Sequence, residues 1–491
     1  MFSNPTTTAE ISINRPVAAV EALRGDKVNS KFVVGTSSVR ASEDNHLLLL
    51  RFHSDSNHLG IDATLAHPTG PVEHIRTSPS DLSYILTTAE HSNESETAAA
   101  TLWKIPSDVT DRTPTNNDYG DDLGDEDDDD YYNQDRGRSN NDDVIDSDNV
   151  IAMEERATLQ ASNDSSSNSG AKVVDVAWRG NAWDEELATT STMGDVITLC
   201  SDGTLTQWDL AFGSCESTRR CAVNLNNPTD LSSSSRWNLP ARMSWDPHHA
   251  DIIAYSTGDI VQLIDWREAP SALSSSTTGI ISEKKHLNGH PHHRYGITDL
   301  DYNPNKPNII VTSGKDGLLK FWDLRKTGSD YYDIGGSDGD GDGDDIIING
   351  VGDSTRKKKQ RPVFITRGIH RHWTTCVSYN PFHDQLVLSG GTDSLVNLLR
   401  MSSISSAPLL TFDDDHPNIN ATPLEGSMTK DPKHQPQPEG PNIRVSRYEH
   451  MDSVTAIAWG AADAWIYISA SFDGKVILNH VPTKEKYKIL L

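Results

Sequence analysis

The most constraining feature of this chain is one spacing that occurs three times. A histidine is followed 23 positions later by an aspartate, in the pairs His293 and Asp316, His370 and Asp393, and His450 and Asp473. Apolar residues stand at matching offsets within the repeats, for example Ile297 and Leu300 after the first histidine. Such a recurrence indicates an internal repeat, so the chain is expected to fold as copies of one small unit that bury a shared core.

Short apolar runs rich in β-branched and aromatic residues lie within these repeats, for example at 309–312, 385–388 and 465–468. Asp-Gly or Asp-Ser turn signals follow several of the runs. Helical 3.6-residue periodicity is hard to find along the chain. The sequence therefore predicts an all-β fold.

A second signature stands near the end of the repeat. Six positions after Asp316 the chain reads Trp322-Asp323, and six positions after Asp202 it reads Trp208-Asp209. This frame resembles the WD40 repeat, in which each copy forms one four-stranded blade of a β-propeller. Counting the units predicts a seven-bladed WD40 β-propeller with long disordered acidic insertions.

The repeat frame assigns residues 31–491 to a single propeller, with residues 1–30 as an N-terminal segment leading into blade one. Blades two to seven are expected at 72–106, 172–210, 236–268, 290–326, 370–402 and 443–482. Blade one is the remainder, 31–53, and residues 486–491 are expected to supply its closing strand. Joining both ends of the chain in one blade would close the ring and remove exposed sheet edges.

Four segments differ abruptly in composition from the strands around them. They are rich in Asp, Asn, Ser, Gly and Pro, and they cover residues 107–170, 270–285, 327–361 and 403–442. Segments of this kind cannot bury enough apolar surface to offset the entropy of ordering them. We therefore expect four disordered insertions.

The WD40 resemblance implies a structural role for the repeated histidine and aspartate. In such blades the aspartate accepts a hydrogen bond from the histidine, which also contacts a Ser or Thr that meets a Trp. Each buried polar group then has a partner. Blade five would hold the complete tetrad as His293, Thr312, Asp316 and Trp322.

The next two blades keep part of this tetrad. Blade six offers His370, Ser389 and Asp393, with Leu399 in place of the tryptophan. Blade seven offers His450, Ser469 and Asp473, with Asn479 in place of the tryptophan. We expect the incomplete tetrads to stabilise these two blades less than the complete tetrad stabilises blade five.

Particular stretches resemble one WD40 family: the proteins that interact with the endosome-associated recycling protein (EARP) and Golgi-associated retrograde protein (GARP) complexes. These stretches are 32–36, 46–50, 299–306, 320–323, 383–390, 448–454, 472–477 and 486–491. The resemblance implies a non-enzymatic adaptor that binds subunits of these tethering complexes, as a monomer within a larger assembly. It also implies roles in endosomal recycling and endosome-to-Golgi retrograde traffic, at a cytoplasmic location peripheral to endosomes and the trans-Golgi network. No short motif marks the tether-binding surface, so no partner-binding residue is assigned.

Enzymatic, cofactor and metal sites are not expected. The Gly-rich stretch 335–343 lacks the flanking strand and helix of a phosphate-binding loop. Residues 338–343 copy the first half of an EF-hand loop, but position twelve of that loop would be Asn349 instead of the bidentate Glu. One loop holds His286, His290, His292 and His293 and another holds His370 and His372, without cysteine or carboxylate ligands at zinc-site spacing. The repeat already explains His293 and His370 as tetrad members. The basic run 356–361 is interpreted as a solvated loop, with nuclear import or lipid contact as the alternative.

Charge and hydropathy limit the partners further. The formal net charge of −28 repels phosphate backbones, so nucleic-acid binding is not expected. No apolar run approaches the roughly 20 residues that a membrane-spanning helix needs, and the N-terminus lacks the pattern of a secretory signal. We expect a soluble intracellular protein without direct membrane insertion.

One alternative function stays open. Trp322-Asp323-Leu324-Arg325 matches the W-D-x-R pattern of WD40 substrate receptors of cullin-4 ubiquitin ligases. Trp322 and Asp323 already belong to the blade signature, so Arg325 is the additional signal. Under this alternative Arg325 would contact the ligase adaptor.

Overall fold

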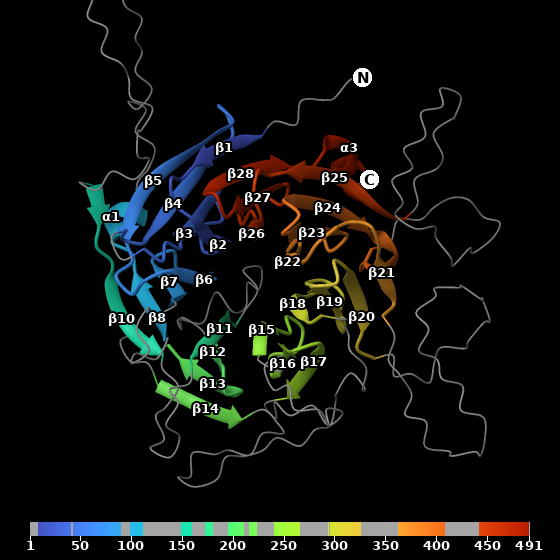
Figure 1. The fold of residues 1–491 in the computed structure, drawn as a ribbon, viewed down its shortest axis with the longest axis horizontal. Coiled ribbons are helices and arrows are strands. Elements are labelled where there is room, and N and C mark those ends of the chain that lie inside the picture. Colours follow the sequence, from blue (N-terminus) through green and yellow to red (C-terminus); the bar gives the residue numbers. More distant parts are fainter. Residues whose placement is uncertain are drawn as a thin grey trace, which may run out of the picture.

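The computed structural model shows seven β-sheets arranged around a central axis (Figure 1). It describes residues 8–40, 43–89, 99–110, 149–159, 172–179, 195–210, 216–222, 240–265, 293, 295–325, 362–407 and 441–490. The predicted seven-bladed WD40 propeller is confirmed. The parts predicted as insertions at 270–285 and 327–361 lie outside the described residues. So do 408–440, the three histidines at 286, 290 and 292, and the basic run.

The first three blades occupy the N-terminal half of the chain. Blade one contains β2 (Val17–Ala22), β3 (Lys31–Thr36), β4 (His46–His53) and β5 (His58–Ala66), with the two-residue β9 (Val150–Ile151) added in parallel. Blade two contains β6 (Val72–Thr77), β7 (Tyr84–Ala89), β8 (Ala100–Lys104) and β10 (Glu154–Leu159). Blade three contains β11 (Val173–Trp178), β12 (Asp195–Cys200), β13 (Thr204–Asp209) and β14 (Glu216–Ala222).

The remaining blades complete the ring. Blade four contains β15 (Pro240–Trp245), β16 (Ile252–Thr257) and β17 (Ile260–Asp265). Blade five contains β18 (Ile297–Tyr302), β19 (Ile309–Gly314), β20 (Leu319–Asp323) and β21 (Phe364–Thr366). Blade six contains β22 (Thr374–Tyr379), β23 (Leu386–Gly391), β24 (Leu395–Met401) and β25 (Asn442–Glu449). Blade seven contains β26 (Val454–Trp459), β27 (Ile466–Ser471), β28 (Lys475–His480) and β1 (Ala9–Ser12).

Within each blade we name the strands a to d from the central axis outward. Successive strands within blades two to six run antiparallel, so all a–b loops lie at one end of the propeller and all b–c turns lie at the other. The end with the b–c turns also carries the connections from each d strand to the next a strand. We call it the d–a face, and we call the opposite end the a–b face.

The closure of the ring differs from the prediction. The strand that completes blade seven is β1 from the N-terminus, which pairs with β28 from Ala9 opposite Leu478 to Ser12 opposite Lys475. Residues 486–490 instead lie in helix α3 (Thr483–Leu490). The predicted closure of blade one by 486–491 is therefore wrong, although one terminus still covers a sheet edge that would otherwise be exposed.

Tertiary contacts explain why the C-terminal segment is helical. The helix follows Pro482, whose carbonyl accepts the backbone N–H of Glu485 at 2.9 Å. The Glu485 carboxylate forms a buried ion pair with Arg400 of β24 at 2.5 Å. Ile489 packs against an apolar cluster of blades six and seven. These contacts hold α3 on the a–b face.

Several predicted boundaries also change. Residues 1–30 include β1 and β2, and blade one extends to β5 rather than ending at 53. The segment 107–170 contains helix α1 (Ser107–Thr110) and strands β9 and β10. Residues 443–449, predicted in blade seven, form β25 at the outer edge of blade six, and residues 402–404 form the short helix η2 (Ser402–Ile404). In blades five and six the d strand, β21 or β25, comes from the stretch before the next tetrad histidine, so a sequence repeat is offset from a structural blade there.

The apolar core lies between neighbouring blades rather than inside one of them. One cluster joins Val34 and Leu48 of blade one to Ile468 and Leu478 of blade seven. Another joins Phe321 of blade five to Leu399 of blade six. Since each blade buries its faces against two neighbours, the ring is the unit that folds and its loops are presented on a rigid support.

Candidate interaction surfaces

Blade five brings together the four side chains of the predicted tetrad. His293 is fully buried, and its Nδ1 lies 2.7 Å from Asp316 Oδ1. Its Nε2 lies 2.9 Å from Thr312 Oγ1, which also accepts the indole N–H of Trp322 at 3.0 Å. Burial lowers the pKa of His293. Burial also opposes ionisation of Asp316, but the hydrogen bond from His293, nearby positive charge including that of Lys320, and the Leu318 amide together bring the pKa of Asp316 to about 2. The tetrad therefore holds a neutral histidine against a carboxylate.

Blade six has the same arrangement without the tryptophan. His370 Nδ1 lies 2.9 Å from Asp393 Oδ1, and its Nε2 lies 2.9 Å from Ser389 Oγ. Leu399 occupies the tryptophan position, and the amide nitrogen of Asn397 lies 3.3 Å from His370 Nε2. A second polar neighbour thus stands beside the histidine in this blade.

Blade seven departs from the predicted tetrad. His450 Nε2 lies 2.8 Å from Ser469 Oγ, but Asp473 accepts the hydroxyl of Ser471 and forms no hydrogen bond with His450. His450 Nδ1 is buried without a hydrogen-bond partner. The predicted pairing of His450 with Asp473 is therefore wrong.

Blades two and three also contain partial tetrads, which were not predicted from the sequence. In blade two, His67 Nε2 lies 2.9 Å from Thr87 Oγ1, and Trp103 donates its indole N–H to the same oxygen at 2.8 Å. In blade three, Trp208 donates to Thr198 Oγ1 at 2.9 Å. The Thr–Trp separation is 16 residues in blade two but 10 in blade three, because blade two has a longer b–c connection. This insertion masked the motif in blade two.

An apolar patch, which the sequence did not predict, lies on the d–a face over blades five to seven. It consists of four exposed residues: Tyr295 (55% exposed), Trp373 (46%), Met451 (86%) and Phe472 (53%). The first three lie on the d–a connections, and Phe472 lies on the b–c turn of blade seven. We call these four residues the d–a patch. Large apolar side chains gathered on one exposed face are typical of protein-binding surfaces.

The tetrad histidines fix the loops that carry this patch. Tyr295 follows His293, Trp373 follows His370, and Met451 follows His450, each within three positions. The three histidines are buried and hydrogen-bonded to their blades. The neighbouring exposed residues are therefore held in place without ordering their loops on binding.

Basic groups border the patch on blades five and six. The Lys315 ammonium lies 5.3 Å from the centre of the Trp373 ring, a cation–π geometry. The imidazole of His372 stacks on the same ring with centroids 5.3 Å apart, and Arg371 is exposed beside it. This side of the patch is suited to a partner segment that combines apolar and acidic side chains.

Arg325 lies at the opposite end of blade five from the patch, just after β20. Its guanidinium donates from Nε and Nη2 to the two carboxylate oxygens of Asp323, both at 2.9 Å. The Arg325 side chain is 58% exposed. The structure thus places the W-D-x-R arginine on the surface, in a bidentate pair with its own motif aspartate.

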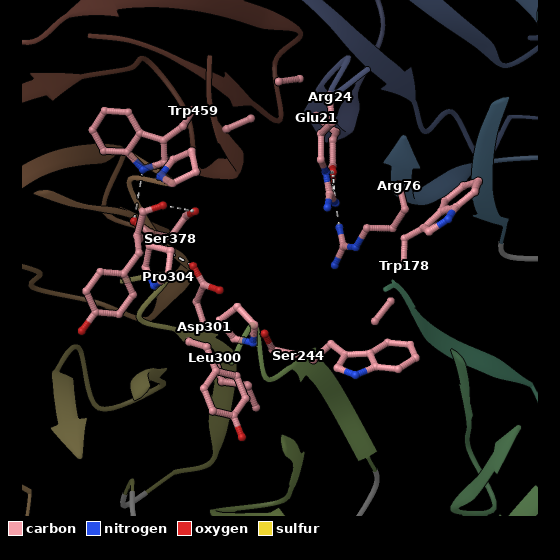
Figure 2. Close-up of a pocket in the computed structure, with 18 of the residues that line it drawn as sticks. Glu21, Arg24, Arg76, Trp178, Ser244, Leu300, Asp301, Pro304, Ser378 and Trp459 are labelled. Carbon is pink, nitrogen blue, oxygen red and sulfur yellow. Dashed lines mark hydrogen bonds and ion pairs between the residues drawn. The ribbon is translucent and has the colours of Figure 1, made fainter. Parts of the chain in front are cut away.

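The central channel contains a cavity of about 490 Å³ that opens toward the a–b face. The a strands and a–b loops line it, and Trp178, Trp459, Arg76 and Asp301 are seen around it in Figure 2. Arg76 is paired with Glu21 at 3.2 Å and with Asp175 at 3.4 Å. Arginines and carboxylates of several blades therefore meet inside the ring.

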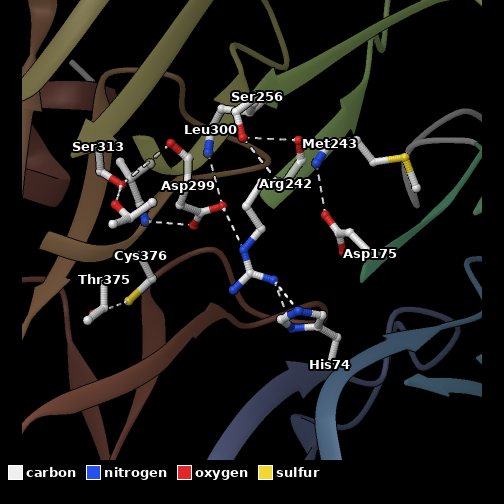
Figure 3. A network of polar contacts seen from close by, with 12 residues as sticks. His74, Asp175, Arg242, Met243, Ser256, Asp299, Leu300, Ser313, Thr375 and Cys376 are labelled. Carbon is white, nitrogen blue, oxygen red and sulfur yellow. Dashed lines mark hydrogen bonds and ion pairs between the residues drawn. The ribbon is translucent and has the colours of Figure 1, made fainter. Parts of the chain in front are cut away.

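Closer to the d–a face, a second set of polar contacts crosses the channel wall (Figure 3). The Arg242 guanidinium lies 3.8 Å from Asp299 and within hydrogen-bond distance of the His74 ring. Burial, and then the charge of Arg242, keeps the pKa of His74 well below its ordinary value. His74 is therefore a neutral partner of this arginine.

Among the described residues, no group of three His, Cys, Asp or Glu side chains is placed to hold a metal ion. Within the same residues, no helix is long and apolar enough to cross a membrane.

Comparisons with known proteins agree with this architecture. The family model described as "WD domain, G-beta repeat" matches residues 282–323 and 443–478. The chain is 27% identical to "EARP and GARP complex-interacting protein 1" of Rattus norvegicus, over 94% of this chain and 93% of that protein. It is 28% identical to "EARP-interacting protein 1" of Caenorhabditis elegans, over 50% of this chain and 52% of that protein. It is 23% identical to "WD repeat-containing protein DWA2" of Arabidopsis thaliana, over 94% and 93% respectively.

The similarity to the rat protein covers almost the whole propeller, including stretches beyond the matched repeats. The family that the sequence resembles is thereby confirmed. Along nearly its whole length, this chain is similar to WD40-repeat proteins that are named for their interaction with the EARP and GARP complexes.

Proposed function

We propose that this protein is a non-enzymatic adaptor that binds subunits of EARP- and GARP-type tethering complexes. In this role it supports endosomal recycling and endosome-to-Golgi retrograde traffic. Similarity to proteins named for these complexes, over 94% of the chain, supports the class of partner. The observation that carries the mechanism is the d–a patch, whose four apolar side chains are exposed on one face of the ring.

The patch has the composition of a binding surface. The patch combines two exposed aromatic residues with polar tips, Tyr295 and Trp373, with the flexible thioether of Met451. Aromatic anchors supply most of the energy in many interfaces, and methionine adapts its shape to the partner. Buried histidines hold the three loops, so little conformational entropy is lost on binding.

Membrane association would come through the tethering complex. The formal net charge of −28 disfavours direct docking on anionic lipid. We also propose that the protein is a monomer within the larger assembly. It would be cytoplasmic and peripheral to endosomes and the trans-Golgi network.

The cullin-4 alternative depends on Arg325. The exposure of Arg325 on the a–b side of blade five favours a surface role. However, its guanidinium already donates to both carboxylate oxygens of Asp323. A ligase adaptor would have to compete with this pair or extend it. We keep this function as the second candidate because one exposed, well-oriented arginine supports it.

Affinity purification with mass spectrometry separates the two candidates. Wild-type protein and Arg325→Ala would be purified in parallel from the native cells. The proposal predicts tether subunits with both proteins, since Arg325 lies away from the d–a patch. Ligase adaptor with the wild type alone, and no tether subunits in either sample, would overturn it.

A further inference from the structure

Three carboxylates of the central channel share one contact. Each lies on an a strand and accepts a backbone N–H from the a strand of the next blade. Asp175 accepts from Met243 at 2.9 Å, Asp299 from Val377 at 3.0 Å and Asp301 from Tyr379 at 2.9 Å. These bonds tie neighbouring blades together along the channel.

Two of the three carboxylates also have an arginine from the preceding blade. Arg76 of β6 lies 3.4 Å from Asp175, and Arg242 of β15 lies 3.8 Å from Asp299. Asp301 lacks such a partner: among the described residues, none forms an ion pair with it. The channel therefore repeats a carboxylate–arginine pair twice and leaves the third pair incomplete.

The short side chain of Ser244 stands where the third arginine would be needed. Ser244 is two residues beyond Arg242 on β15, as Asp301 is two residues beyond Asp299 on β18, so each pair faces the same side of its strand. Ser244 and Asp301 both line the 490 Å³ cavity (Figure 2). There is space beside Asp301 on the side from which the other carboxylates receive their arginines.

The walls of the cavity fit a flat cation. Trp178, Trp245 and Trp459 line it near the a–b face, and a guanidinium stacks on indole rings as well as pairing with carboxylates. Arg179 already lies over the Trp245 ring at 5.8 Å, so this wall accepts such stacking in the free protein. An ammonium group could pair with Asp301 but would lack the planar stacking.

We propose that the central channel receives an arginine side chain of a bound protein partner from the a–b face, and that its guanidinium pairs with Asp301. The insertion would complete in trans the pairing that Arg76 and Arg242 make in cis. This site is separate from the d–a patch and does not depend on which protein binds there.

The ionisation of Asp301 is consistent with a missing cation. Burial, which exceeds the lowering effect of the Tyr379 amide, raises the pKa of Asp301 to about 7. The charged groups that act on it are Asp299 on its own strand, which raises the pKa, and Arg76 on β6, which lowers it. The adjacent strands β15 and β22 present Ser244 and Tyr379. A guanidinium would favour the ionised carboxylate, so binding should strengthen as pH rises through 7.

Saturation-transfer NMR on the purified full-length protein tests the inference with acetyl-Gly-Arg-Gly-amide as the probe. The citrulline analogue removes the charge while keeping the shape, and the lysine analogue tests the planar group. We expect saturable binding of the arginine peptide with a Kd of about 1 mM or tighter. Affinity should be at least about tenfold weaker for the citrulline analogue, a loss of ~1.4 kcal/mol.

Two variants locate the site. Asp301→Asn keeps an acceptor for the Tyr379 amide but removes the charge, and Ser244→Arg supplies the missing cation within the chain. Both should lose the peptide signal, whereas Asp452→Asn, the same change on the d–a face, should keep it. Binding that persists in Asp301→Asn, or no saturable signal in the wild type up to about 10 mM, would overturn the inference. Neither result would bear on tether co-purification.

Discussion

Ser471 donates its hydroxyl hydrogen to the carboxylate of Asp473, two residues along the chain. Blades five and six have Gly314 and Gly391 at the position of Ser471, and a Cβ there would lie 2.1 Å and 2.5 Å from Nδ1 of the tetrad histidine. The glycine leaves room for the histidine to reach its aspartate. In blade seven the serine takes the aspartate instead, and His450 Nδ1 is left buried without a partner.

Replacing Ser471 by glycine should restore the missing contact. Burial lowers the pKa of His450 to about 4, with the charge of Asp473 opposing it. In Ser471→Gly we expect this pKa to rise, because Asp473 is freed to accept from Nδ1. Ser471→Ala is the matched control, since it removes the hydroxyl but keeps the Cβ. An NMR titration that gave the same His450 pKa in both variants would contradict this explanation.

Replacing Asp316 should destabilise the protein more than replacing Asp473. Asp316→Ala leaves the fully buried His293 without its Nδ1 partner, so we expect a loss of about 1–3 kcal/mol in the free energy of unfolding. Asp473→Ala removes no contact to His450 and should cost clearly less. Urea denaturation of both variants measures the difference. Equal losses would mean that the His293–Asp316 contact adds nothing.

Stability should fall in mild acid because His450 is buried in its neutral form. Its pKa is about 4 in the folded protein and ~6.5 in an unfolded chain, so the unfolded state binds the proton more readily. Above about pH 6.5 the neutral His450 does not lower the free energy of unfolding. As the pH falls from about 6.5 to about 4, the free energy of unfolding decreases by about 3 kcal/mol. In His450→Gln the loss between pH 7 and pH 4.5 should be smaller. An unchanged pH dependence in this variant would count against the prediction.

Ring closure should depend on the N-terminal strand. Deleting residues 1–12 removes β1, leaves the edge of β28 unpaired and removes Ala9 from the core between blades seven and one. We expect a lower melting temperature and aggregation in light scattering. Deleting residues 1–7 keeps β1 and serves as the control. If both truncated proteins stayed monomeric with the melting temperature of the wild type, β1 would not close the ring.

The fold could be predicted from the sequence because the repeat sets both the spacing and the residue types of the tetrad. The His–Asp spacing occurs in three repeats and gives a hydrogen-bonded pair in blades five and six, at Asp316 and Asp393. It could not identify β1, since Ala9–Ser12 is four residues long with two apolar side chains, and its pairing partner is more than 460 residues away. The segment 486–490 alternates polar and apolar residues like a strand, but it lies in helix α3, which is held by the ion pair of Glu485 with Arg400 and by Lys486 over the Trp465 ring.

The candidate surfaces were less predictable than the fold. Trp373 and Met451 are ordinary apolar residues in the sequence, and their exposure on one face follows from the arrangement of three blades. Asp301 shares its pattern with Asp299, and the absence of an arginine beside it emerges only when neighbouring a strands are compared. The competition between Ser471 and His450 for Asp473 could have been found, because Gly314 and Gly391 mark this position in the repeat.

The central claim, that the d–a patch holds the tethering complex, is tested by a paired co-purification. Trp373→Ala with Met451→Ser removes two patch side chains. Tyr487→Ala with Leu490→Ser removes two similarly exposed side chains, 61% and 62%, from α3 on the a–b face. Quantitative mass spectrometry should show at least a tenfold loss of tether subunits with the patch variant, and wild-type recovery with the α3 variant. Full recovery with the patch variant, or loss with the α3 variant alone, would contradict the account.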